Sequence, residues 1–184
     1  MISLVIFSKT EKNKMAFSYS FKWLSLLLAA ASLITIASAD EALIESICST
    51  TGNTPLCNNI LKTSVVSERG GLGQLLTNVA LRKVHKSLNL VRQLAKISTD
   101  FRTKNQYDAC LEVFDDAFDS LKECKKRFSE NNLNDANVMA SAALTDIDTC
   151  SDEVTNAPPQ LTDAIKESSN IIRIVLAASY DGPA

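Results

Sequence analysis

The residues with the greatest potential for chemistry form two polar rows in the second half of the chain. The first row has four carboxylates spaced three or four positions apart: Glu112, Asp116, Asp119 and Glu123. The second row has Thr145, Thr149 and Asp152. On a helix, this spacing places each row on one face. Paired carboxylates act as acid and base only where burial or a cleft separates their pKa values. The rows therefore favour recognition of a partner, although the solvated side of an ordinary helix has the same pattern.

Enzyme signatures are absent from the sequence. It contains no G-x-S-x-G elbow, no glycine-rich phosphate loop and no Cys-x-x-Cys motif. The single histidine, His85, is interpreted as a surface residue, because a di-metal bundle needs Glu-x-x-His motifs that face inward. Gly70, Gly71 and Gly73 are interpreted as a hinge before a long helix. The sequence therefore predicts a protein that is not an enzyme and that binds no cofactor or metal.

The N-terminal segment has the three-part plan of a secretory signal. Four lysines precede the 14-residue apolar run Leu24–Ala37, which ends in small residues. This run is shorter than the ~20 residues that span a bilayer. We expect cleavage after residue 39, so that residues 1–39 are a signal peptide and the product is secreted. Met15 begins a more ordinary signal than Met1, so residues 1–14 are interpreted as an upstream extension, and the true start stays open.

Cleavage also changes the charge of the chain. The whole chain has 19 basic and 21 acidic residues, and the leader contains four lysines and one glutamate, so the product has 15 against 20 and a net charge of −5. Nucleic acid binding depends on neutralising phosphates, so an acidic product argues against a nucleic acid partner. We also expect no membrane association after cleavage.

Beyond residue 71, apolar residues recur every three or four positions, which predicts four amphipathic helices. The first stripe contains Leu72, Leu76, Ala80, Val84, Leu88, Val91 and Ala95. The second contains Tyr107, Cys110, Leu111, Phe114, Phe118, Leu121, Cys124 and Phe128. The third contains Ala136, Met139, Ala143, Leu144, Ile147, Cys150 and Val154, and the fourth Leu161, Ile165, Ser168, Ile172 and Val175. The pattern predicts an all-α, up-and-down four-helix bundle at 72–184, preceded by an N-terminal helical hairpin at 40–71.

Polar stretches separate these stripes. The polar segment STDFRTKNQ is expected to separate the first two long helices. SENNLND is the next turn, with Asn134 or Asp135 as the expected N-cap of the following helix. The two prolines of TNAPPQ end that helix, because proline does not fit inside one.

The five cysteines allow several pairings. Cys48 and Cys57 flank the turn-rich STTGNTP stretch, where loop closure costs little entropy. In an antiparallel second and third helix, Cys110 and Cys150 lie ~27 and ~22 Å from the turn, whereas Cys124 lies ~6 Å from it. A disulfide needs Cα atoms ~4.4 to 6.8 Å apart, so we predict the disulfides Cys48–Cys57 and Cys110–Cys150. Cys124 is then free, and a buried core thiol is favoured over a redox or intermolecular role.

The second disulfide bears on the two polar rows. If the disulfide brings Cys110 and Cys150 to the same height along the two helices, Glu112 lies near Thr149 and Asp116 lies near Thr145. The rows then form one continuous polar surface, because the cross-link prevents one helix from sliding along the other.

Several segments together resemble the plant invertase and pectin methylesterase inhibitor family. They are the leader, the cysteine pair in a helical hairpin, CLEVFDDAFDSL and SAALTDIDTCSDEV, and the resemblance extends from about Glu41 to Tyr180. Members of that family are secreted helical bundles that block a carbohydrate-processing enzyme through a reversible complex. The resemblance implies a location in the apoplast or cell wall and a protein enzyme as the partner.

The resemblance also implies a target and a site. In pectin methylesterase inhibitors, the helices that match the second and third long helices here cover the substrate cleft of the enzyme. The matching target-binding residues are Glu112, Asp116, Asp119, Thr149 and Asp152. Inhibitors of acid invertase use a Pro-Lys-Phe segment, which is absent here. We therefore predict a 1:1 inhibitor of pectin methylesterase, with an acid invertase inhibitor or a non-inhibitory secreted binding protein as alternatives. Because the proposed face is acidic and its carboxylates share protons with acids of the enzyme, we expect tighter binding in mild acid.

Two departures from the family pattern stand out. The first cysteine loop, CSTTGNTPLC, lacks the usual aromatic residue. An aromatic residue often found just before SAALT is replaced around Met139. Both changes concern packing and potency more than the fold.

Overall fold

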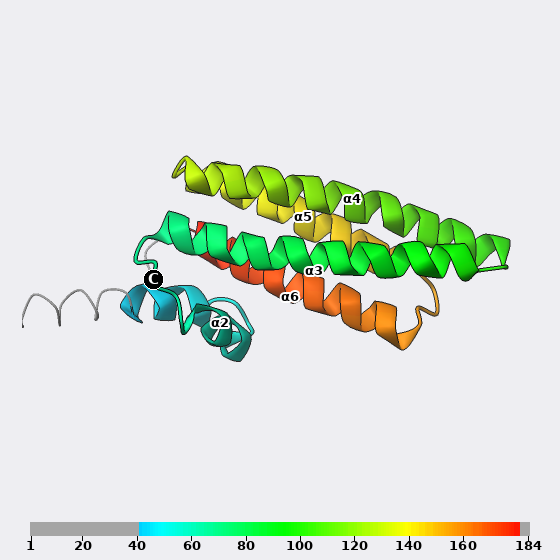
Figure 1. Ribbon diagram of the computed structural model, residues 1–184, viewed down its shortest axis with the longest axis horizontal. Helices are drawn as coiled ribbons and strands as arrows, with labels where there is room; N and C mark the ends of the chain where they lie inside the picture. Colours follow the sequence, from blue (N-terminus) through cyan, green and yellow to red (C-terminus); the bar gives the residue numbers. More distant parts are fainter. Residues whose placement is uncertain (1–40, 181–184) are drawn as a thin grey trace, which may run out of the picture. The chain divides into compact units, whose positions relative to one another are not determined.

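The computed structural model describes residues 41–180, and the regular structure of this part of the chain is helical. A helical segment at residues 41–49 is followed by α2 (Thr54–Leu61), α3 (Arg69–Ile97), α4 (Phe101–Ser129), α5 (Leu133–Glu153) and α6 (Pro159–Ser179) (Figure 1). None of the described helices is both long and apolar enough to span a membrane. The expected signal peptide at residues 1–39 lies outside the described residues.

The four long helices form an up-and-down bundle, which confirms the predicted fold class. Helix α3 packs against α4 and α6, and α5 packs against the same two helices. Figure 1 shows α4 and α5 together on one side of the bundle and α3 and α6 on the other. The bundle therefore has two opposite seams, α4/α5 and α3/α6, with different residues on their outer sides.

The predicted apolar stripes form the core. Every residue of the α3 and α6 stripes is buried, including Ser168. In α4 and α5 the stripe residues are also buried, except that Leu111, Phe118, Met139 and Leu144 are half-buried. Small residues dominate the inner side of α5, with Ala136, Ala140 and Ala143 fully buried. Because alanine occupies little space, α5 can approach its neighbours closely.

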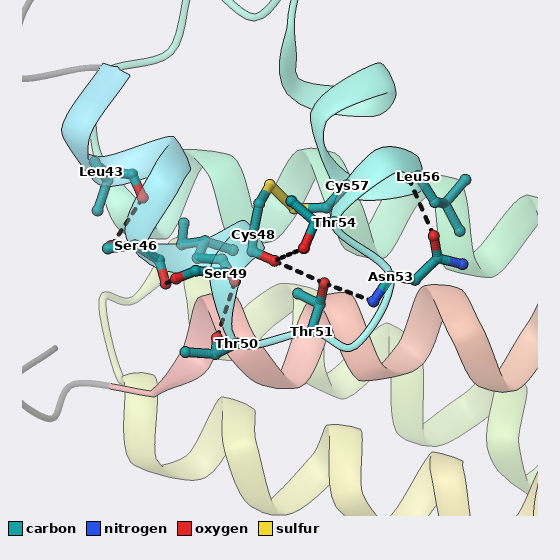
Figure 2. Close-up of a disulfide and its surroundings, with 11 residues drawn as sticks. Leu43, Ser46, Cys48, Ser49, Thr50, Thr51, Asn53, Thr54, Leu56 and Cys57 are labelled. Atoms are coloured by element: carbon teal, nitrogen blue, oxygen red, sulfur yellow. Dashed lines mark hydrogen bonds between the residues drawn. A yellow bond between two sulfur atoms is a disulfide. The ribbon is translucent and has the colours of Figure 1, made fainter.

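The N-terminal hairpin is closed by the predicted disulfide between Cys48 and Cys57 (Figure 2). The carbonyl oxygen of Cys48 accepts hydrogen bonds from the hydroxyls of Thr51 at 3.0 Å and Thr54 at 3.1 Å. Asn53 caps α2, because its side-chain oxygen accepts a hydrogen bond from the backbone N–H of Leu56 at 3.2 Å. The hydroxyl and amide side chains of this turn therefore satisfy the backbone groups that the two helix ends leave open.

The expected glycine hinge is wrong, because Gly70, Gly71 and Gly73 lie inside α3, which begins at Arg69. A Cβ atom on Gly73 would overlap the ring of Phe128, and one on Gly70 would lie 3.0 Å from the Phe128 carbonyl oxygen. Phe128 is buried near the end of α4. Glycine is needed here because α3 and the end of α4 approach so closely that a side chain would not fit.

Two helix starts also differ from expectation. Helix α4 begins at Phe101, within the predicted break, because the Asp100 carboxylate accepts hydrogen bonds from the Thr103 backbone N–H at 2.8 Å and hydroxyl at 2.7 Å. Helix α5 is capped by Asn132, and the expectation of Asn134 or Asp135 is wrong. The Asn132 side-chain oxygen accepts from the Asp135 N–H at 3.2 Å, and its amide donates to the Asp135 carboxylate at 2.8 Å. Asp135 therefore orients the Asn132 side chain, while the Asn132 backbone N–H donates to the Arg127 carbonyl oxygen at 2.9 Å.

Candidate functional site

The α4/α5 seam is joined by the predicted disulfide between Cys110 and Cys150. Both residues are fully buried, and their Cα atoms lie 4.7 Å apart. They are 40 residues apart in the sequence. Closing a loop of that length stabilises the folded chain by roughly 3 to 4 kcal/mol, because the cross-link restricts the unfolded state. The disulfide therefore sets the relative height of the two helices that carry the polar rows.

Contacts on either side of the disulfide maintain the same antiparallel register. Beyond it, the Gln106 amide donates to the Thr155 hydroxyl at 3.0 Å. Near the α4–α5 turn, the thiol of Cys124 donates to the carbonyl oxygen of Ala136 at 3.3 Å. These contacts and the disulfide together restrain the seam along most of its length, so sliding of one helix along the other would break all of them.

Most of the predicted site residues are exposed on this seam. Glu112, Asp116, Asp119 and Asp152 are exposed, and Thr149 is half-buried. The Thr149 hydroxyl donates to the Thr145 carbonyl oxygen at 2.8 Å, and the Thr145 hydroxyl donates to the Ser141 carbonyl oxygen at 3.1 Å. Both hydroxyl protons are therefore used within α5. The face presents carboxylate oxygens and hydroxyl lone pairs, so its chemistry suits a partner rich in hydrogen-bond donors.

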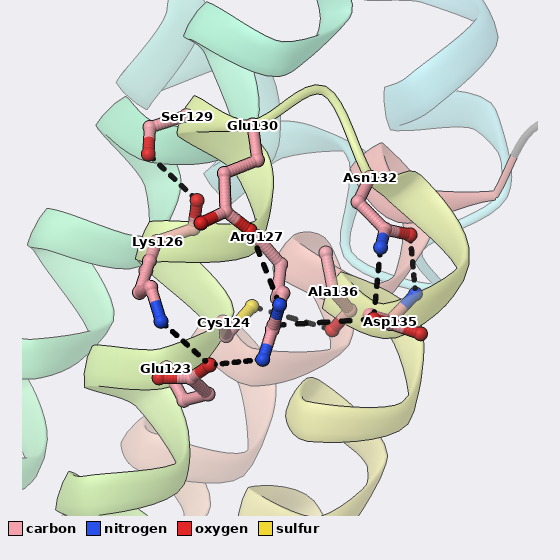
Figure 3. A network of polar contacts seen from close by, with 9 residues as sticks. All are labelled: Glu123, Cys124, Lys126, Arg127, Ser129, Glu130, Asn132, Asp135 and Ala136. Atoms are coloured by element: carbon pink, nitrogen blue, oxygen red, sulfur yellow. Dashed lines mark hydrogen bonds and ion pairs between the residues drawn. The ribbon is translucent and has the colours of Figure 1, made fainter.

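The acidic row on α4 is not uniform. Toward the α4–α5 turn its carboxylates have cationic neighbours: Asp119 pairs with Lys122 at 2.7 Å, and Glu123 contacts both Arg127 and Lys126. Figure 3 shows the contacts of Glu123 within a wider network at this end. Glu112 and Asp116 form no ion pair with another described residue. Unpaired negative charge is therefore concentrated around the height of the disulfide.

Arg127 connects the two helices within that network. Its guanidinium contacts Glu130 at 3.2 Å on its own side and Asp135 of α5 at 3.9 Å (Figure 3). All three side chains retain partial exposure to solvent, so each pair contributes little to stability on its own. The network does neutralise the end of the face that lies away from the disulfide.

Asp146 is a residue of this seam that the sequence analysis missed. It is half-buried on α5 and lies close enough to Asp116 to interact with its charge. Burial raises the pKa of Asp146, and the Asp116 carboxylate raises it further. The sequence contained a usable signal, since Asp146 lies three residues before Thr149 and therefore on nearly the same side of α5. Its neighbour Asp148 points to the other side, where it accepts a hydrogen bond from Ser169 of α6 at 3.0 Å.

The remaining chemically interesting residues lie away from this face. Cys124 is a free, buried thiol, and burial raises its pKa to about 11 although the Thr77 hydroxyl opposes the shift. Such a thiol stays protonated near neutrality and is a poor nucleophile, which agrees with a core role. His85 is exposed on α3, with its ring 5.9 Å from that of Phe118. Among residues 41–180, no group of three or more His, Cys, Asp or Glu side chains is arranged to hold a metal ion.

The sequence and the fold of this chain are similar to those of known proteins. Residues 42–178 match a family model described as plant invertase/pectin methylesterase inhibitor. A pectinesterase inhibitor of Actinidia deliciosa is 32% identical over 178 residues, covering 90% of this chain and 96% of that relative. Pectinesterase inhibitor 2 of Arabidopsis thaliana is 24% identical over 147 residues, covering 77% and 84%. A crystal structure of a mutant form of an Arabidopsis pectin methylesterase inhibitor shares the fold, with a TM-score of 0.68, 22% identity and coverage of 76% of this chain and 97% of that one.

Proposed function

This chain belongs to the plant invertase/pectin methylesterase inhibitor family, and on that premise we propose that it inhibits pectin methylesterase through a reversible 1:1 complex. The outer face of α4 and α5 lies over the cleft where the enzyme binds pectin. The polymer is excluded while the inhibitor itself is neither cleaved nor modified. The residues that contact the enzyme are Glu112, Asp116, Asp119, Thr149 and Asp152.

The observation that carries this proposal is the covalent register of the α4/α5 seam. The Cys110–Cys150 disulfide lies beneath the part of the face where Glu112 and Asp116 form no ion pair within residues 41–180. Because the rows are already ordered, binding costs little side-chain and backbone entropy compared with ordering a flexible loop. A rigid acceptor-rich face therefore favours occlusion by surface complementarity.

The charge of the face implies a pH dependence of binding. Burial and Asp116 both raise the pKa of Asp146, so this carboxyl takes up a proton at a higher pH than an ordinary aspartate does. A protonated Asp146 no longer repels Asp116, and it gains a hydrogen-bond donor for the enzyme. The affinity for pectin methylesterase is accordingly higher in mild acid than near neutrality. A titration in which affinity stays constant or rises with pH would contradict this part of the proposal.

The decisive experiment is a direct comparison of two enzymes. The secreted protein is mixed with purified pectin methylesterase and, separately, with purified acid invertase, and each mixture is analysed by size-exclusion chromatography and activity assay. We expect a 1:1 complex and loss of activity with pectin methylesterase alone. Inhibition of acid invertase alone would identify the protein as an invertase inhibitor. Inhibition of neither enzyme would favour a non-inhibitory binding protein.

Secretion into the apoplast is part of the same proposal. We expect removal of residues 1–39, which contain the only tryptophan, Trp23. The secreted product should therefore begin at Asp40 in N-terminal sequencing and lack tryptophan fluorescence. Retention of that fluorescence in protein recovered from the extracellular fluid would contradict cleavage at this position.

A further inference from the structure

The α3/α6 seam carries a groove with a volume of about 480 Å³ on its outer side. This seam is opposite the α4/α5 face in the bundle (Figure 1). Small-molecule sites commonly have volumes of about 300 to 1,000 Å³. Leu90 of α3 and Ala164 of α6 are half-buried lining residues of the groove, and buried Ser87 lies beside them. The groove thus combines an apolar floor with walls of polar side chains.

The register of the seam decides which wall residues face each other. Lys83 pairs with Glu167 across the seam at 2.7 Å, which closes one end of the groove. The helices are antiparallel, so a residue about one turn further along α3 faces a residue about one turn earlier on α6. Lys86 and Asp163 therefore lie at matching heights, yet no ion pair joins these two described residues. Lys86 lies close enough to Glu167 to help lower the pKa of that carboxyl, but neither Lys86 nor Asp163 forms an ion pair with a described residue.

Four polar side chains line the open part of the groove without a hydrogen bond to any other described residue. They are Lys86, Gln93, Gln160 and Asp163. The ammonium group only donates hydrogen bonds, the carboxylate only accepts them, and the two amides do both. Hydroxyl groups also donate and accept, so neighbouring hydroxyls on one ligand can satisfy all four.

The balanced charges of the groove lining further restrict the class of ligand that it can bind. Lys83 and Lys86 are matched by Asp163 and Glu167, so the lining has no formal net charge and gives no preference for a charged molecule. The C–H face of a sugar ring is apolar and can lie on Leu90 and Ala164, while its hydroxyl edge reaches the walls. A ring of this kind matches both the floor and the walls.

We propose that the groove between α3 and α6 binds an uncharged sugar ring, alone or at the end of a short neutral oligosaccharide. Asp163 accepts hydrogen bonds from two neighbouring hydroxyls, Lys86 donates one, and Gln93 and Gln160 contact the rest of the hydroxyl edge. This site is separate from the enzyme-binding face and does not depend on the proposed inhibition.

The test is a titration of the ¹⁵N-labelled secreted protein with cellobiose and with methyl β-galactopyranoside, followed by amide chemical shifts. We expect saturable shifts at the amides of 86–93 and 160–167 with at least one of these sugars. Because the groove is open and buries one face of the ring, the dissociation constant is expected in the millimolar range. Gln160→Ala with Asp163→Ala should weaken binding at least about tenfold, which corresponds to ~1.4 kcal/mol.

Controls separate loss of the site from loss of the fold. Lys166→Ala changes an exposed residue of α6 outside the groove, and it should leave sugar binding unchanged. Asp163→Asn keeps the size of the side chain but removes its charge, and it should weaken binding while the thermal transition stays in place. Neither groove variant alters the α4/α5 face, so both should inhibit pectin methylesterase as well as the parent protein does. The sugar titration uses no enzyme, so its result is independent of the proposed function.

Several results would overturn the proposal. They are the absence of saturable shifts with both sugars, shifts located on α4 and α5, and equal binding by the double variant. Tighter binding of glycylglycine than of either sugar would also overturn it, because a zwitterion would then be the better match to Lys86 and Asp163.

Discussion

The two opposite seams of this bundle are held together by different interactions. At α4/α5, a buried disulfide joins the helices beneath an acidic outer face. At α3/α6, buried Ser87 and Ser168 share a hydrogen bond at 3.1 Å, and the exposed Lys83–Glu167 pair lies above them. A covalent bond resists sliding, whereas hydroxyl pairs and exposed ion pairs can be exchanged for water at small cost. The α4/α5 seam is therefore the one where a rigid binding face is expected.

The largest effect should come from reversing the polarity of the α4/α5 face. Asp116→Arg combined with Thr149→Lys places two cations where the proposed partner expects acceptors, so inhibition of pectin methylesterase should be abolished. The thermal transition should change little, because Asp116 is exposed and Thr149 is only half-buried. Inhibition assays and thermal melts measure the two outcomes.

The other seam offers a matched control for that experiment. Thr162→Lys combined with Asp163→Arg makes the same change of residue types at exposed positions of α6. Inhibition should persist in this control. Full inhibition by the α4/α5 double variant, or equal loss in both, would place the binding face elsewhere.

Removing the disulfide should have the next largest effect, this time on stability. Cys110→Ala with Cys150→Ala should lower the free energy of unfolding by roughly 3 to 4 kcal/mol, because the unfolded chain regains the freedom of a 40-residue loop. Urea denaturation measures the change.

The corresponding replacement at the other seam is Ser87→Ala with Ser168→Ala. Removing both partners of a buried hydrogen bond leaves no partner unsatisfied in that bond, so the cost should stay within about 1 kcal/mol. Equal losses at both seams would mean that the disulfide contributes no special restraint.

A third prediction concerns one glycine at the contact of α3 with α4. Gly73→Ala introduces a methyl group that overlaps the Phe128 ring. Overpacking of this kind typically costs about 1 to 3 kcal/mol, and urea denaturation should show it. Gly52→Ala is a useful contrast, because Gly52 has a φ of +67° and no atom within 4 Å of a Cβ placed there. Its cost would come from backbone strain alone.

The smallest predicted effects are changes in the free energy of unfolding with pH, and they should have opposite signs at the two seams as the pH falls. The pKa of Asp146 is raised in the folded protein, so its ionised form destabilises the fold above that pKa, and the cost disappears as pH falls below the ordinary aspartate value of 3.8. The Lys83 ammonium lowers the pKa of Glu167, so this group stabilises the fold above the ordinary glutamate value of 4.5, and that contribution is lost as pH falls through its lower folded pKa.

Urea denaturation across the acidic range should resolve these two contributions. Asp146→Asn should stabilise the protein near neutrality, and the difference from the parent should vanish in acid. Glu167→Gln should destabilise it slightly near neutrality, by less than about 1 kcal/mol because the pair is exposed. A difference that grows in acid for Asp146→Asn would reverse the assigned direction of its pKa shift.

Much of the fold was predictable because it follows from local pattern. The apolar stripes are regular enough to place all four long helices, and the predicted pairing of Cys110 with Cys150 rests only on helix rise and an antiparallel turn. The helix starts were less predictable, since Asp100 and Asn132 compete with nearby polar residues that are equally good caps in sequence. The role of Gly73 was misjudged because a glycine at a hinge and a glycine under an aromatic ring look alike in sequence.

The candidate site divides in the same way. The spacing of Glu112, Asp116 and Thr149 was sufficient to place them outside the core, because that depends on the helical repeat alone, although Thr149 is half-buried. The half-burial of Asp146, the contact of Arg127 with Asp135 and the opposed positions of Lys86 and Asp163 depend on which helices become neighbours. Only the tertiary structure decides these features, because burial and pairwise charge interactions are set by distances between residues far apart in the chain.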